Sequence, residues 1–142
     1  DELLKRADIV SVHTPLTTAT RHMIGERELG LMKADAILVN TARGPVIEEA
    51  ALVSALQEGQ ILGAGLDVFE QEPTPVDNPL LQLENLVATP HTAGFSAESV
   101  ELTWRLSVEA CIDLAEDKWP RSYVNRTVTP RWALSEKERE AM

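Results

Sequence analysis

Short apolar runs alternate with longer amphipathic stretches along this chain. Four runs of strand length, each bounded by polar or turn-forming residues, lie at 7–12, 36–39, 61–68 and 86–89. Apolar positions at helical spacing predict helices over 25–32, 48–58 and about 96–118, and residues 1–6 are typical of the end of a further helix. Strands that alternate with helices predict an α/β fold with a parallel sheet.

The predicted helices differ in character. Gly59 follows the 48–58 helix and is expected to cap it, because glycine adopts the left-handed backbone without a Cβ penalty. The 96–118 helix is apolar over so much of its circumference that we expect it to pack on more than one surface, with Cys111 buried as a small hydrophobic side chain. The charged end, 135–142, is expected to be mobile.

A nucleotide-binding sheet of this kind should begin with a strand, a G-x-G-x-x-G turn and a phosphate-binding helix. The sequence offers only Gly63-Ala64-Gly65, which lies inside a predicted strand and has Val68 where the third glycine should be. We therefore predict a partial Rossmann-like, doubly wound parallel sheet with flanking helices and a long C-terminal helix.

Composition narrows the possible functions. A chain of 142 residues with 44% hydrophobic residues can form one domain with a core, and its net charge of −10 argues against nucleic acid as a partner. A single cysteine fits a reducing, cytoplasmic compartment, and no apolar run is long enough to predict a membrane span. The spacing of His13, His22 and His91 predicts no metal site.

Candidate functional residues follow the ends of all four predicted strands, where ligands bind in open α/β sheets: His13, Arg43, Asp67 and His91. The Arg43 guanidinium can bind a carboxylate with two hydrogen bonds, although, for Arg43 taken alone, a surface arginine in a turn is the simpler reading. Asp67 either caps a turn or receives an amide or ring group of a cofactor. Glu72 and His91 are a candidate acid–base pair, against the simpler readings of a solvated acidic run and a polar loop residue.

Together these pieces resemble the D-isomer-specific 2-hydroxyacid dehydrogenase family, which includes D-3-phosphoglycerate dehydrogenase, glycerate/hydroxypyruvate reductase and D-lactate dehydrogenase. The matching segments are ADIVSVHTPL at 7–16, LVNTARG at 38–44, GAGLDVFEQEP at 63–73 and TPHTAG at 89–94. They occur in family order and spacing, and the resemblance spans about residues 1 to 126.

The resemblance implies hydride transfer between NAD (or NADP) and C2 of a small 2-oxo or 2-hydroxy acid. Arg43 would bind the substrate carboxylate and 2-oxo oxygen, His91 would be the general acid/base, and Glu72 would orient it. Asp67 would contact the nicotinamide carboxamide. The other positions implied on the cofactor side are His13, Pro15, Thr41, Ala42, Thr92, Ala93 and Gly94, together with Arg43 and His91 themselves.

The family pattern also implies a division of the chain. Residues 1–95 would be the C-terminal portion of an NAD-binding domain, 96–119 the long helix that returns toward a substrate domain, and 120–142 a tail. On this resemblance the chain is expected to start midway through the dinucleotide fold, and we therefore expect it to be inactive alone. The alternative is a non-catalytic oligomerisation or binding module derived from that fold, and a homo-oligomer is expected.

Overall fold

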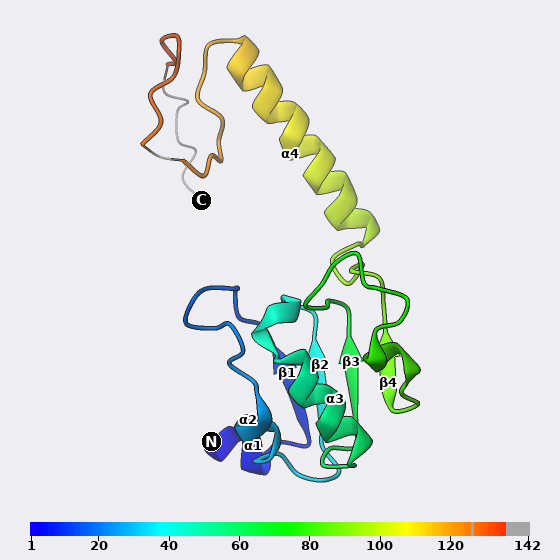
Figure 1. Cartoon of the computed structure of the whole chain (residues 1–142). Coiled ribbons are helices and arrows are strands. Elements are labelled where there is room, and N and C mark those ends of the chain that lie inside the picture. The colour runs from blue at the N-terminus through cyan, green and yellow to red at the C-terminus, as the bar shows by residue number, and fades with distance from the viewer. Residues whose placement is uncertain (126, 136–142) are drawn as a thin grey trace. The chain divides into compact units, whose positions relative to one another are not determined.

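The computed structural model describes residues 1–125 and 127–135. The chain divides into two compact units, Asp1–Ala93 and Gly94–Met142, which are considered separately below. The first unit holds the sheet and the shorter helices, and the second holds the long helix and the segment that follows it (Figure 1).

The sheet of the first unit has four parallel strands in sequence order: β1 (Ile9–Val12), β2 (Ile37–Asn40), β3 (Gly63–Leu66) and β4 (Leu86–Ala88). The register pairs Val10 with Leu38, Leu38 with Ala64, and Ala64 with Leu86. Because all strands are parallel, their carboxyl ends share one edge of the sheet (Figure 1). The predicted parallel α/β sheet is confirmed.

Helix α1 (Glu2–Arg6) precedes β1, and the connections between strands contain α2 (Glu26–Leu29), η1 (Gly44–Val46), α3 (Glu49–Gln57) and η2 (Pro79–Gln82), of which η1 and η2 are 3-10 helices. Helix α2 is shorter than predicted, because the helix ends at Gly30. Gly59 adopts a positive φ of 67°, as expected of a residue that ends a helix.

One face of the sheet carries the core of this unit. Val10, Leu38 and Leu66 alternate inward and join Leu52 and Leu56 of α3 in one buried cluster. The opposite face is open: Ile9 is 64% exposed and Val87 is 71% exposed. The buried face fixes the register, since a slip of one residue would turn these side chains to the open face.

The second unit contains α4 (Ala97–Ala115), which is capped by Ser96: its hydroxyl accepts from the Ser99 amide at 3.1 Å. Beyond the helix, the rings of Trp119 and Tyr123 stack with centroids 4.7 Å apart, and Lys118 forms a single parallel bridge to Ser135. The mobility predicted for 135–142 concerns residues that lie, apart from Ser135, outside the described part of the chain.

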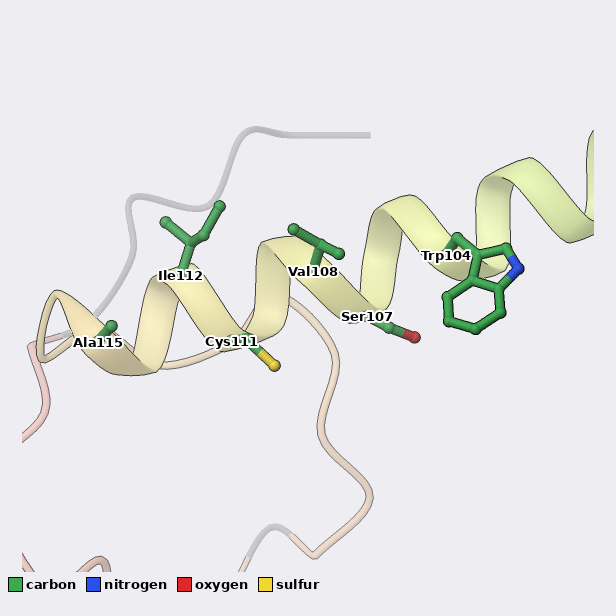
Figure 2. A pocket seen from close by; sticks show the side chains of 6 residues that line it. All are labelled: Trp104, Ser107, Val108, Cys111, Ile112 and Ala115. Atoms are coloured by element: carbon green, nitrogen blue, oxygen red, sulfur yellow. The ribbon is translucent and has the colours of Figure 1, made fainter.

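Apolar side chains of α4 are exposed. Trp104, Val108 and Ile112 line a shallow apolar pocket along the helix with Ser107, Cys111 and Ala115 (Figure 2), and exposed fractions of 70%, 55% and 50% are found for Trp104, Val108 and Ile112. Cys111 is exposed, so its predicted burial was wrong. Helical periodicity identifies an apolar face, but burial of that face requires a partner surface, which the sequence of the helix does not contain.

Candidate active site at the carboxyl edge of the sheet

His91 and Glu72 form a hydrogen-bonded pair beyond the ends of β4 and β3. Nδ1 of His91 lies 2.8 Å from Oε2 of Glu72, and Oε1 of Glu72 accepts from the Phe69 amide at 3.0 Å. His91 has a positive φ of 55°, and its amide donates to the Asp67 carbonyl at 2.9 Å. With Nδ1 committed to Glu72, Nε2 is the ring nitrogen available to exchange a proton with a ligand.

The carboxyl group of Glu72 is held in its ionised form. Partial burial opposes ionisation, but the hydrogen bonds from His91 and the Phe69 amide, and the charges of His91 and Arg43, outweigh it and lower the pKa of Glu72 from its ordinary value. The Glu72 side chain remains 38% exposed, so solvent screens part of these interactions.

Arg43 lies in a turn that Asn40 shapes. The buried Asn40 side chain accepts from the Ala42 amide at 3.0 Å and donates to the Arg43 carbonyl at 3.0 Å. Nη1 of Arg43 donates to the Ala42 carbonyl at 2.6 Å. The guanidinium acts on Glu72 through its charge.

Asp67 anchors the loop that carries His91. The residue is 3% exposed; Oδ1 accepts from the Thr89 hydroxyl and from the Thr92 amide at 2.8 Å, and Oδ2 accepts from the Ala93 amide at 2.9 Å. Burial opposes ionisation, but these three donors and the nearby charge of His91 outweigh it and lower the pKa of Asp67. A carboxylate has about four acceptor positions, so Oδ2 keeps one for a further donor.

The other predicted cofactor-side residues are more exposed. Nε2 of His13 lies 2.8 Å from the Ser11 hydroxyl, and the Pro15 carbonyl accepts from the Thr20 hydroxyl at 2.6 Å. Thr41 is exposed and Ala42 half-buried in the Arg43 turn, whereas Gly94 begins the second unit. Their predicted contacts with a cofactor stay predictions.

The hydroxyl of Thr14 indicates where a ligand could bind. This hydroxyl, between His13 and Pro15 in the loop after β1, is buried and has no hydrogen-bond partner among the described residues. Buried hydroxyls are normally paired. Together with the open acceptor position on Asp67, it fits a ligand that carries amide or hydroxyl groups at this edge of the sheet.

Sequence reasoning missed Asn40 and Thr89, as well as Thr14. Asn40 is the last residue of β2 and precedes Thr41-Ala42-Arg43, a position where an Asx-type turn could have been recognised. Thr89 reveals its bond to Asp67 only in three dimensions, since 22 residues separate the two.

Two further findings concern other classes of site. The described residues contain no group of three or more histidine, cysteine or acidic side chains placed to hold a metal ion. None of the helices in the described parts of the chain is both long and apolar enough to cross a membrane.

The fold and this edge define an α/β nucleotide-binding domain of the Rossmann-like class. The family described as "D-isomer specific 2-hydroxyacid dehydrogenase, NAD binding domain" matches residues 1–93. The chain belongs to this family, as its four sequence motifs predicted.

Individual relatives agree with this assignment. A glyoxylate reductase of Korarchaeum cryptofilum is 51% identical over 128 residues, which are 90% of this chain and 39% of the relative. A solved D-lactate dehydrogenase with NAD+ from Lactobacillus jensenii is 38% identical with a TM-score of 0.80, over 88% of this chain and 42% of that one. An acyclic imino acid reductase in complex with NADPH and D-Arg is 38% identical with a TM-score of 0.75, over 87% and 39%. The chain thus spans about two-fifths of the length of these proteins.

Proposed function

We propose that this chain is the C-terminal part of an NAD-dependent D-2-hydroxyacid dehydrogenase that acts on a small 2-oxo or 2-hydroxy acid. The observation that carries the proposal is the 2.8 Å hydrogen bond between His91 and Glu72, placed beside the Arg43 turn at the carboxyl edge of the sheet. Family membership of residues 1–93 and a glyoxylate reductase at 51% identity support it.

The roles of the three residues follow from their chemistry. Arg43 binds the substrate carboxylate and stabilises negative charge on the 2-oxo oxygen. His91 donates a proton from Nε2 to that oxygen during reduction and takes it back during oxidation. Glu72 is ionised, so it accepts the Nδ1–H and holds the imidazole in the tautomer and orientation that this transfer requires.

Among the described residues, Thr14 and Asp67 each have an unused hydrogen-bonding position, which fits the amide and hydroxyl groups of a pyridine dinucleotide. The other residues proposed on the cofactor side are His13, Pro15, Thr41, Ala42, Thr92, Ala93 and Gly94. When bound, the reduced cofactor supplies the hydride that is added to C2 of the substrate. NADP is an alternative, since the chain has no acidic residue at a second-strand end to select the ribose.

The isolated 142-residue chain is proposed to have negligible turnover, because its sequence contains no G-x-G-x-x-G turn for the pyrophosphate. The proposed division assigns 1–95 to the nucleotide-binding domain, 96–119 to the helix that returns toward a substrate domain and 120–142 to a tail. Robust oxidation of NADH by the purified chain with any 2-oxo acid would contradict the expected inactivity, without contradicting the site.

Ligand binding tests the site independently of turnover. We expect glyoxylate, titrated into isotope-labelled chain, to shift the NMR signals of the Arg43 guanidinium and the His91 imidazole in a saturable way. Acetate, which lacks the 2-oxo oxygen, should bind more weakly. Arg43→Lys should weaken glyoxylate binding by about tenfold, because lysine cannot reproduce the two-bond contact. Arg105→Lys, on exposed α4, is the matched control.

Glyoxylate shifts that are equal in the Arg43→Lys and Arg105→Lys variants would contradict the proposed substrate site. A parallel calorimetric titration with NADH reports on the cofactor side alone. We expect Asp67→Ala to weaken any NADH binding, whereas Asp77→Ala, an exposed aspartate in the following loop, should not.

A second candidate function is favoured by α4. Its exposed apolar side chains form a surface of the kind that seeks burial against protein. We propose that the apolar surface of Trp104, Val108 and Ile112 pairs with a second copy of the chain, so that the protein is a homo-oligomer. This assembly role is compatible with the enzyme function and also stands as the alternative to it, a non-catalytic oligomerisation module.

A further inference from the structure

Glu49 and Glu70 hold one another's backbone. The Glu49 amide, at the first residue of α3, donates to Oε1 of Glu70 at 2.9 Å, and the Glu70 amide donates to Oε2 of Glu49 at 3.0 Å. This reciprocal pair of hydrogen bonds joins the start of α3 to the segment that follows β3. Each carboxylate accepts a backbone N–H, which offsets the repulsion expected between two acidic side chains.

Glu49 also holds the far end of the same segment. Its Oε1 accepts from Nδ2 of Asn78 at 2.5 Å. Asn78 is 7% exposed and caps η2, since its Oδ1 accepts from the Leu80 amide at 2.9 Å. One carboxylate therefore fixes both ends of the loop 70–78, and Glu72 lies within that loop.

The peptide between Phe69 and Glu70 is the point where this loop meets the Arg43 turn. A Cβ atom on Gly44 would lie 1.8 Å from the Phe69 carbonyl oxygen, so the two backbones are in direct contact. The Phe69 amide donates to Glu72 at 3.0 Å, and the next amide along the chain donates to Glu49. The position of Glu72 thus depends on the same short stretch of backbone that Glu49 binds.

We propose that Glu49 is a positioning residue for the acid–base pair: it holds the loop 70–78 at both ends and thereby keeps Glu72 in place to orient His91. The inference rests on the proposed function of Glu72 and His91, but its structural content does not require a substrate. Glu70 contributes to the same attachment of the loop, because its Oε1 also lies 2.9 Å from Nε2 of His22.

The simpler role of an acidic residue at a helix start is to complement the helix dipole. Glu48, the N-cap residue of α3, separates the two roles. It carries the same charge one residue earlier, is exposed, and makes no side-chain hydrogen bond to the described residues. Glu48→Gln therefore removes the same charge from the helix start and leaves the loop contacts intact.

The test compares Glu49→Ala, Glu49→Gln and Glu48→Gln in the whole chain by NMR, without ligands. Amide hydrogen exchange is read at Phe69, whose N–H binds Glu72 and does not touch Glu49. The carboxyl carbon of Glu72 is titrated with pH, with His91 and Arg43 as the charged groups that act on it. Exchange of the Leu38 and Ala64 amides in the sheet monitors the fold.

In Glu49→Ala we expect exchange at Phe69 to rise by about tenfold and the pKa of Glu72 to move up toward its ordinary value. Glu49→Gln should give a smaller change, because its amide can still accept from Glu70 but presents N–H groups to Asn78. Glu48→Gln should match the wild type. Faster exchange at Glu70 alone, with Phe69 and the pKa of Glu72 unchanged, would overturn the proposal.

If Glu49→Ala no longer folds, as faster exchange of the sheet amides would show, Glu49→Gln provides the test instead. In that case Glu49→Gln with wild-type values at Phe69 and Glu72 overturns the inference, and an intermediate change supports it. Neither outcome depends on whether glyoxylate or NADH binds, so failure here is distinguishable from failure of the proposed function.

Discussion

At the scale of single residues, Asp67 shows how one buried carboxylate can organise a loop. It lies at the end of a buried strand, and its three donors come from Thr89, Thr92 and Ala93, on either side of His91. The His91 loop is therefore attached to the sheet at both ends. Loss of this carboxylate should disturb the loop more than the loss of any exposed acidic residue.

We expect Asp67→Asn to lower the free energy of unfolding by about 2 to 4 kcal/mol, because an amide nitrogen would face backbone donors that need an acceptor. Urea unfolding followed by circular dichroism measures the change. Asp77→Asn, at an exposed position of the 70–78 loop, should change the free energy by less than about 0.5 kcal/mol. Equal effects of the two substitutions would contradict the anchoring role.

The difference in unfolding free energy between wild type and Asp67→Asn should depend on pH, and the sign of this dependence follows from the shifted pKa of Asp67. The pKa of Asp67 is lowered in the folded chain from its ordinary value of 3.8, so its stabilisation is fully present above pH 3.8 and is lost as the pH falls through the lower folded value. The gap between wild type and Asp67→Asn should stay constant near neutral pH and narrow only below about pH 3.8. A gap that narrows between pH 5 and 7 would identify another titrating group.

The sequence predicted the residues that carry the candidate chemistry, but not the hydrogen bonds that hold them in place. The strand ends placed Arg43, Asp67 and His91 at one edge, and residue chemistry, independently of the family resemblance, made Glu72 and His91 a candidate pair; the 2.8 Å contact agrees with that pairing. The bonds that hold these residues join Asp67 to Thr92 and Glu49 to Glu70, across 25 and 21 residues. Such contacts leave no periodic pattern, so only a folded backbone reveals them.

At the scale of secondary-structure elements, the site depends on how closely the Arg43 turn approaches the end of β3. Gly44 opens η1 and is buried against the Phe69–Glu70 peptide. This contact sets the distance between the element that carries Arg43 and the loop that carries Glu72. A side chain at this position cannot be accommodated without separating the two.

Gly44→Ala should therefore lower the free energy of unfolding by about 3 kcal/mol, since its Cβ would lie 1.8 Å from a backbone oxygen that cannot rotate away. Gly65→Ala is the matched control, because a Cβ there would meet only the Val39 side chain at 3.9 Å. We expect Gly65→Ala to change stability by less than about 1 kcal/mol. Urea unfolding of both variants is the measurement, and similar losses would contradict the steric argument.

Elements whose pattern reflects burial within the first unit were predicted well, and their ends less well. All four strands were found, because Val10, Leu38 and their neighbours alternate toward a core that the same unit supplies. The 61–68 run was predicted as strand throughout, but β3 covers only Gly63–Leu66. Val68 is buried although it lies outside the strand, so an apolar run does not by itself mark where pairing stops.

At the scale of the whole molecule, two apolar surfaces remain open: the second face of the sheet and the exposed side of α4. Parallel sheets are normally covered on both faces, whereas Ile9 and Val87 are largely exposed here. The chain spans about two-fifths of the length of its relatives, and exposed surfaces of this kind are sites of association.

We expect the purified chain to self-associate through the α4 surface. Sedimentation velocity over a range of concentrations should show a species larger than the 15.6 kDa monomer, and Val108→Glu should shift the population toward monomer by burying a charge in the contact. Leu3→Glu, which places the same charge on an exposed apolar residue of α1, is the control. A monomer at all concentrations would contradict the proposed pairing, as would equal effects of the two substitutions.

Position 91 has a left-handed backbone, with a φ of 55°. The residue there must tolerate this backbone conformation, and in the proposed function it must also exchange a proton. Asparagine, like histidine, adopts such torsion angles more readily than most residues, whereas for a β-branched residue they are a genuine outlier. His91→Asn should therefore remove the imidazole, and with it the proposed proton transfer, while the loop keeps its path; His91→Val should distort the loop as well. A substitution at position 91 must therefore first be compatible with the positive φ, and only a residue that meets this condition can be compared with histidine in the proposed acid–base role.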